Sequence, residues 1–185
     1  MHLRDDLNIK DIRGNVDTRL EKLDAGQYDA IVLAAAGLKR LGLDSRIGQL
    51  FDTQQIFPAV GQGALGIETR KEISSDLSTA LGKLKHDESF AAAMAERHML
   101  RRLFAGCLAP VGALTTMSSG DDSPDGELSL EGVVLGRDGK TVIKAKRNRP
   151  PEQFEALGIE VAEALLASGA EELLRPPASH QSTDG

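Results

Sequence analysis

The sequence predicts an α/β segment followed by a small α+β domain, and two observations support this prediction. In the first part, a helical pattern lies between an alternating run and a near-continuous apolar run, as in a β-α-β unit. In the second part, apolar residues at helical spacing precede three short runs in which apolar and polar residues alternate. We therefore expect the second part to form a three-stranded antiparallel sheet with helices on one face.

The predicted β-α-β unit begins with residues 7–12, which alternate like a short strand. Asn15 is the natural N-cap of the helix that follows, and Gly26 ends that helix. Residues 28–34 then form an apolar run that is typical of a strand buried on both faces of a parallel sheet. A second short helix is expected over residues 35–41.

The predicted α+β domain is preceded by a return to helical spacing near Ile73. Its expected strands are residues 111–115, 128–135 and 141–146. A polar loop at residues 118–126 joins the first two strands in this prediction, and a tight turn at residues 136–139 joins the last two. A helix beginning near Pro151 follows, and residues 176–185 are expected to be a disordered tail. The residues that this last helix is expected to bury are Phe154, Leu157, Val161 and Leu165.

Composition narrows the possible functions. The 185 residues are 41% hydrophobic, which suffices for one large or two small domains. Aromatic residues are scarce and the net charge is −6, so we expect no nucleic-acid partner. No membrane span or signal peptide is apparent, and a single cysteine excludes an internal disulfide. We expect a cytoplasmic protein, and we predict no metal site.

Cys107 is the candidate for covalent chemistry. It follows a helix that carries three arginines near its end, Arg97, Arg101 and Arg102. Positive charge favours the nucleophilic thiolate, and Gly106 lets the backbone come close to whatever the sulfur holds. The alternative is a small buried hydrophobic residue, which is the usual role of a lone intracellular cysteine.

Arginines near the first helix suggest an anion pocket. Arg13 precedes the start of this helix and Arg19 lies on its second turn, so both could converge with free backbone N–H groups on a carboxylate. The alternative is a pair of solvated arginines with Asp11 or Glu21 as partner. Arg40 ends the next helix, where a cation also suits the helix dipole.

A glycine-rich stretch at residues 61–66 has the spacing G-x-G-x-x-G. A dinucleotide site requires this motif between a buried strand and a helix, whereas an extended, alternating segment follows here. We interpret these glycines as positions where a strand crosses between domains or where the backbone approaches a ligand.

Three long motifs in this order resemble the porphobilinogen deaminase (hydroxymethylbilane synthase) family. Residues 13–20 and 28–42 are similar to that family's second domain, residues 58–68 to its interdomain segment, and the run around Cys107 to its cofactor-attachment loop. The resemblance implies a periplasmic-binding-protein-like second domain, here incomplete, before the α+β domain.

The resemblance also implies a function in the biosynthesis of tetrapyrroles such as haem and chlorophyll. Cys107 would hold a dipyrromethane cofactor through a thioether. The enzyme, a deaminating transferase, would add four porphobilinogen units to this primer, lose ammonia each time, and release hydroxymethylbilane by hydrolysis. Porphobilinogen and the polypyrrole intermediates would be its ligands, and the full-length family is expected to be monomeric.

The resemblance further assigns binding residues. Every pyrrole carries an acetate and a propionate, for which bidentate guanidinium groups are well suited. Arg13 and Arg19 match family residues that bind these carboxylates, and Arg40 matches a third. The residues that would border the cleft, with backbone amides available to the substrate, are Gln62, Gly63 and Ala64.

This sequence departs from the family pattern in one important respect. It starts inside the second domain, so we expect it to be a carboxy-terminal part that lacks most of the first domain and the catalytic aspartate. No catalytic residue is assigned, and the chain alone is expected to be inactive. The alternatives are a noncatalytic anion-binding fragment or one half of a split enzyme. The fragment would self-associate or need a first-domain partner.

Four segments follow from this interpretation. Residues 1–57 would be the remainder of domain 2, and residues 58–80 an interdomain segment that returns to the first domain. Residues 81–175 would form the cofactor-attachment domain and residues 176–185 the tail. The returning segment is expected to be the least stable element, with its apolar face exposed.

Overall fold

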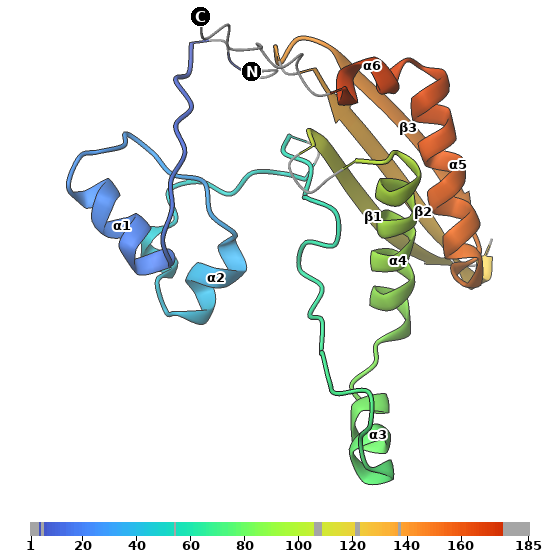
Figure 1. Cartoon of the computed structure of the whole chain (residues 1–185). Coiled ribbons are helices and arrows are strands. Elements are labelled where there is room, and N and C mark those ends of the chain that lie inside the picture. Colours follow the sequence, from blue (N-terminus) through green and yellow to red (C-terminus); the bar gives the residue numbers. More distant parts are fainter. Residues whose placement is uncertain are drawn as a thin grey trace, which may run out of the picture. The chain divides into compact units, whose positions relative to one another are not determined.

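The computed structural model describes residue 4 and residues 6–53, 55–105, 109–120, 123–136 and 138–175 (Figure 1). Its internal contacts divide the chain into two compact units. We call them the N-unit, which ends at Ile56, and the C-unit, which begins at Phe57.

The N-unit contains two short helices, α1 (Val16–Asp24) and α2 (Ala35–Arg40), followed by the 3₁₀ turn η1 (Asp44–Arg46). Asn15 caps α1, because its side-chain oxygen accepts the Thr18 N–H at 2.9 Å. Each helix buries one leucine, Leu20 in α1 and Leu38 in α2. Both predicted helices and the predicted cap are confirmed.

The two strands predicted in the N-unit are not present in this structure. Residues 7–12 and 28–34 belong to no strand. Two apolar side chains on them face solvent, with Ile9 66% and Val32 67% exposed. A strand requires a neighbour for its N–H and C=O groups, and no described residue forms a sheet ladder with either segment. The Tyr28 hydroxyl donates to the Asp11 carbonyl at 2.8 Å, which is a side-chain contact and not strand pairing. The β-α-β prediction is therefore corrected here to two helices joined by irregular segments.

The C-unit contains the predicted three-stranded antiparallel sheet. Its strands, β1 (Val111–Gly120), β2 (Ser123–Leu135) and β3 (Val142–Arg149), lie in the order β1-β2-β3. The β1 and β2 strands are longer than predicted, since their pairing continues to Gly120 and Ser123. The polar loop predicted at residues 118–126 is thus mostly strand. Ladder hydrogen bonds join backbone groups, so a polar run can extend a hairpin.

Helices cover one face of this sheet, as predicted (Figure 1). Helix α4 (Asp87–Arg102) packs on β1 and β2, and α5 (Phe154–Ala167) packs on β2 and β3 and against α4. The shorter helices of the unit are α3 (Ser75–Gly82), the 3₁₀ turn η2 (Pro151–Gln153) and α6 (Ala170–Leu174). Within the described residues, no helix has the length and apolar character needed to cross a membrane.

The core of the C-unit lies between the sheet and the α4–α5 pair. Three of the four side chains predicted to be buried on α5 are fully buried, and Phe154 packs at the border of the core. Two glycines allow close approach at this layer. An ideal Cβ on Gly158 would lie 2.3 Å from the Ala95 carbonyl oxygen, and one on Gly132 would lie 2.5 Å from Met99 Sδ. The largest fully buried side chains are Met99, Leu128, Leu130, Leu157, Leu165, Val134 and Val161.

Candidate functional site

Two of the predicted site arginines lie at the start of α1, Arg13 in the preceding loop and Arg19 on the helix itself. Gly14 has a φ of 123°, which favours glycine, and this turn lets its carbonyl accept the Nε–H of Arg19 at 2.8 Å. The carbonyl of Arg13 accepts the Nζ–H of Lys22 at 2.9 Å. The side chain of Arg13 is exposed and that of Arg19 is half-buried. Side chains of α1 therefore hold the loop by donating to its backbone carbonyls. The terminal guanidinium nitrogens of Arg19 remain available for a ligand.

Neither Arg13 nor Arg19 pairs with the carboxylates considered as alternative partners. Among the described residues, Arg13, Arg19 and Arg40 form no ion pair. Arg46 of the same unit, in contrast, lies 2.5 Å from Asp24. Unpaired guanidinium groups are suited to bind an external carboxylate in bidentate geometry.

Arg40 lies on the second helix of the N-unit. It occupies the last turn of α2 and is exposed. Its position at a helix C-terminus agrees with both interpretations given to it, a ligand contact and a favourable interaction with the helix dipole.

Residues 61–64 of the glycine-rich stretch form a tight turn with Gln62 and Gly63 at its centre. We call it the Gly61 turn, after its first residue. Gly61 and Gly63 have φ values of 72° and 87°, and Ala64 donates its N–H to the Gly61 carbonyl at 3.2 Å. The side-chain oxygen of Gln62 accepts the Ala59 N–H at 3.0 Å, which leaves its NH₂ group as the free end. Among the described residues, the N–H of Gly63 has no acceptor. Gly63 and Ala64 are exposed, so this turn presents a backbone donor to solvent.

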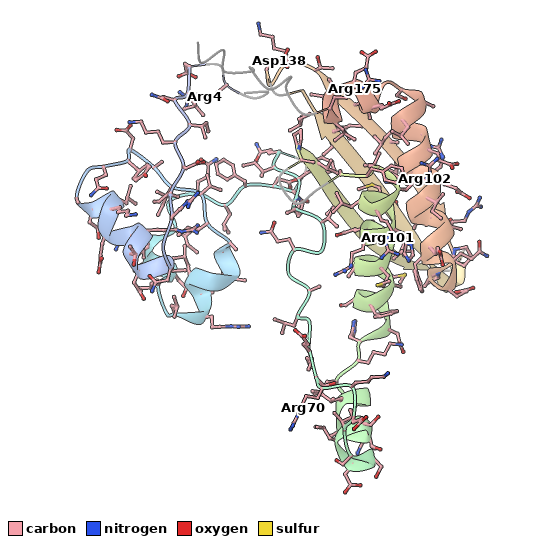
Figure 2. All side chains as sticks on the ribbon, viewed as in Figure 1. Arg4, Arg70, Arg101, Arg102, Asp138 and Arg175 are labelled. Carbon is pink, nitrogen blue, oxygen red and sulfur yellow. The ribbon has the colours of Figure 1, made fainter. Side chains whose placement is uncertain are left out.

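The end of α4 carries the arginines predicted to lie near the thiol. Arg102 lies where α4 faces α5 and is 3.5 Å from Glu163 (Figure 2). Arg97 and Arg101 are exposed and form no ion pair with a described residue. Cys107 and Gly106 lie outside the described residues, so the prediction for the sulfur stays a prediction.

Phe104 ends α4 in an unusual conformation that the sequence did not suggest. It has a φ of 50°, and its N–H donates to the Arg101 carbonyl at 3.0 Å. Phe104 therefore follows the end of this right-handed helix in the left-handed (αL) backbone conformation. Its side chain is 89% exposed, so it gains little from packing. We expect Phe104→Gly to raise the free energy of unfolding by roughly 0.5–1 kcal/mol, because glycine adopts this conformation without steric cost. Urea denaturation checks this.

The matched control for this prediction is Phe104→Ala, which removes the same ring but keeps a Cβ. Its unfolding free energy should stay close to that of the unsubstituted chain. Equal stabilisation by both substitutions would show that the exposed ring, rather than the backbone conformation, was responsible.

Glu96 is a residue near the predicted site that sequence reasoning missed. It is only 9% exposed on α4, among the core positions Ala95 and Met99. One carboxylate oxygen accepts the Gly61 N–H at 2.7 Å and the other accepts the Thr115 hydroxyl at 2.8 Å. An acidic residue next to the apolar stripe of a helix was the available signal.

Comparison with known proteins gives family matches over most of the chain. The family model described as "Porphobilinogen deaminase, dipyromethane cofactor binding domain" matches residues 1–79. The model described as "Porphobilinogen deaminase, C-terminal domain" matches residues 90–167.

Two curated proteins named porphobilinogen deaminase are similar to this chain. The one from Thermus thermophilus is 47% identical over 174 residues, which covers 93% of this chain and 55% of that protein. The one from Gloeobacter violaceus is 46% identical over 173 residues, which covers 94% and 51%. The chain therefore spans about half the length of these relatives. The chain belongs to the porphobilinogen deaminase family.

Proposed function

We propose that this chain contributes to the porphobilinogen deaminase reaction, in which four porphobilinogen units are joined to give hydroxymethylbilane. The observation that carries the proposal is the start of α1, where Arg13 lies in the preceding loop and Arg19 on the helix itself. Neither arginine has a carboxylate partner among the described residues, and both lie in the part matched by the cofactor-binding model. A pair of such guanidinium groups suits ligands with an acetate and a propionate on each ring.

The cofactor that the family implies is dipyrromethane, and the residues present fit it in kind. Cys107 would hold it through a thioether, and Arg13 and Arg19 would bind its carboxylates. When bound, it supplies the pyrrole primer to which substrate units are added. The exposed Gly63 N–H, which has no acceptor among the described residues, is a suitable donor for a further carboxylate.

The chain's other predicted residues would bind and orient porphobilinogen. Arg40 would add a third guanidinium group, and the Gly61 turn, with Gln62 and Ala64 beside Gly63, would supply backbone donors at the border of the cleft. No residue of this chain takes the role of the family's catalytic aspartate in this proposal. Binding and orientation of carboxylates are therefore its contribution to the reaction.

In the proposed architecture, the N-unit is part of a periplasmic-binding-protein-like domain. Residues 7–12 and 28–34 would become strands when further strands of the whole protein pair with them. Residues 58–80 would return to the first domain, and residues 81–175 would form the cofactor-attachment domain. Exposure of Leu65 (85%) and Ile67 (61%) supports this, because both are apolar side chains that a partner sheet would cover.

A colorimetric pyrrole assay with porphobilinogen tests the proposed function. The chain should be assayed alone and together with a polypeptide that supplies the half of the relatives it does not match. We expect turnover only when both are present, and we expect Arg19→Leu to reduce it strongly. Sustained turnover by the chain alone would contradict the division of roles. If the mixture is inactive and porphobilinogen does not bind, a noncatalytic fragment is the better interpretation.

A further inference from the structure

Residues 57–61 wrap around the free edge of β1, and we call this segment the edge clasp. At the edge itself, the Pro58 carbonyl accepts the Ala113 N–H at 3.0 Å. The clasp thus continues the hydrogen bonding of the sheet beyond its outer strand. The segment that leads into the Gly61 turn is therefore part of the C-unit.

Phe57 fixes the clasp on the sheet face opposite the helices. An ideal Cβ on Gly112 would lie 2.7 Å from Phe57 Cβ and 3.0 Å from a methyl group of Val133, so the missing side chain makes room for the phenylalanine. Lys144 places its Nζ 4.8 Å from the centre of the Phe57 ring and 3.9 Å from a Glu131 carboxylate oxygen. Packing of the Phe57 ring and the cation–π contact with Lys144 therefore hold the Phe57 end of the edge clasp.

Glu96 fixes the other end of the clasp, on the helix-covered face. Its carboxylate accepts the Gly61 N–H at 2.7 Å and the Thr115 hydroxyl at 2.8 Å, while Val60 packs at the border of the core. Hydrogen bonds to an ionised carboxylate are shorter and stronger than neutral ones. A buried charge requires such donors, so the position of Gly61 is tied to that of α4.

The consequence concerns the Gly61 turn, which begins at the residue that Glu96 holds. Rotation of the Gly61 peptide would redirect the next N–H groups, including the exposed donor of Gly63. We infer that Glu96 is a positioning residue, which holds the Gly61 turn so that its free backbone donor faces a ligand carboxylate. This inference rests on the proposed function, because only that function supplies a carboxylated pyrrole at the turn.

Two substitutions at this position separate positioning from general stability. Glu96→Ala removes both acceptors. Glu96→Gln keeps a carbonyl oxygen for the Gly61 N–H, and its NH₂ group can donate to the Thr115 hydroxyl oxygen. The matched control is Glu163→Ala, which removes an exposed carboxylate beside Arg102 on the neighbouring helix.

The first measurement is amide hydrogen exchange of the ¹⁵N-labelled chain, read at single residues by NMR. In Glu96→Ala, the Gly61 amide should exchange at least about tenfold faster while amides of β2 keep their rates, since one charge-assisted hydrogen bond is lost. Glu96→Gln, which keeps a neutral acceptor, should accelerate Gly61 less than Glu96→Ala, and Glu163→Ala should resemble the unsubstituted chain. Equal acceleration of Gly61 and β2 in Glu96→Ala, or no change at Gly61, would overturn the inference.

A second readout does not depend on the alanine variant being folded. In Glu96→Gln a neutral amide oxygen replaces the carboxylate as the acceptor, so the Gly61 amide proton resonance should move upfield as its hydrogen bond weakens. A Gly61 resonance that does not move in Glu96→Gln would overturn the inference.

Titration with porphobilinogen then separates this inference from the function on which it rests. We expect the Gln62, Gly63 and Ala64 amide shifts to move, with an apparent Kd about tenfold higher in Glu96→Ala and nearly unchanged in Glu96→Gln. Equal affinity in both variants would overturn the positioning role. If porphobilinogen shifts no amide of the unsubstituted chain, the proposed function fails, while the exchange rate of Gly61 still decides what Glu96 holds.

Discussion

Replacing Gly158 by alanine is expected to destabilise the C-unit by roughly 3 kcal/mol or more, because the new methyl group has no space between α4 and α5. An ideal Cβ at this position would lie 2.3 Å from the Ala95 carbonyl oxygen and 2.9 Å from the Met99 backbone nitrogen. Both contacts are backbone atoms of α4, so relief requires the two helices to separate. Urea denaturation followed by circular dichroism measures this loss.

The matched control is Gly82→Ala at the end of α3. An ideal Cβ there meets nothing within 4 Å, so the unfolding midpoint of the sheet and its helices should not move. Inside a helix, alanine is the better helix former by about 1 kcal/mol, and at Gly158 this preference offsets only part of the clash. A Gly158→Ala variant as stable as the unsubstituted chain would therefore show that α4 and α5 do not approach as closely as described.

The second large effect is expected at Met99, whose side chain is fully buried between the sheet and the helix pair. Met99→Ala should cost about 2–5 kcal/mol, from lost burial and the remaining cavity. Gly132→Ala should also destabilise, because its Cβ would lie 2.5 Å from Met99 Sδ and 3.0 Å from a Leu165 methyl group.

These two substitutions should compensate each other when combined. Removing the methionine sulfur makes space for the methyl group at position 132, so the double variant should be more stable than the sum of the single effects predicts. We expect a coupling of about 1 kcal/mol or more, measured as a double-mutant cycle by urea denaturation. Strict additivity would mean that Met99 does not fill the space above Gly132.

The elements predicted correctly from the sequence are those that depend on nearby residues. The cap at Asn15, the stripe of α5 and the turn between β2 and β3 are local signals, and alternation marked the three strands that pair with their neighbours in the sequence. The strands predicted at residues 7–12 and 28–34 depend on distant partners. Apolar character there indicates burial, but it cannot supply the partner that makes a strand.

The candidate site was predictable to a similar extent. Arg13 and Arg19 were predicted as binding residues because guanidinium groups beside a helix N-terminus are suited to bind anions, and their role stays a prediction. Glu96 was not recognised, because its role depends on Gly61, which is 35 residues away in the sequence. The left-handed conformation of Phe104 was also missed, since glycine is the residue that usually marks such a cap.

The most direct test of the account is the intact mass of the chain when it is co-expressed, in cells that make porphobilinogen, with the polypeptide that supplies the half of the relatives it does not match. We predict an added mass equal to a two-pyrrole unit, and we predict that Cys107→Ser removes it. An unmodified mass for the unsubstituted chain, or an adduct that persists in Cys107→Ser, would contradict attachment of the cofactor to this sulfur.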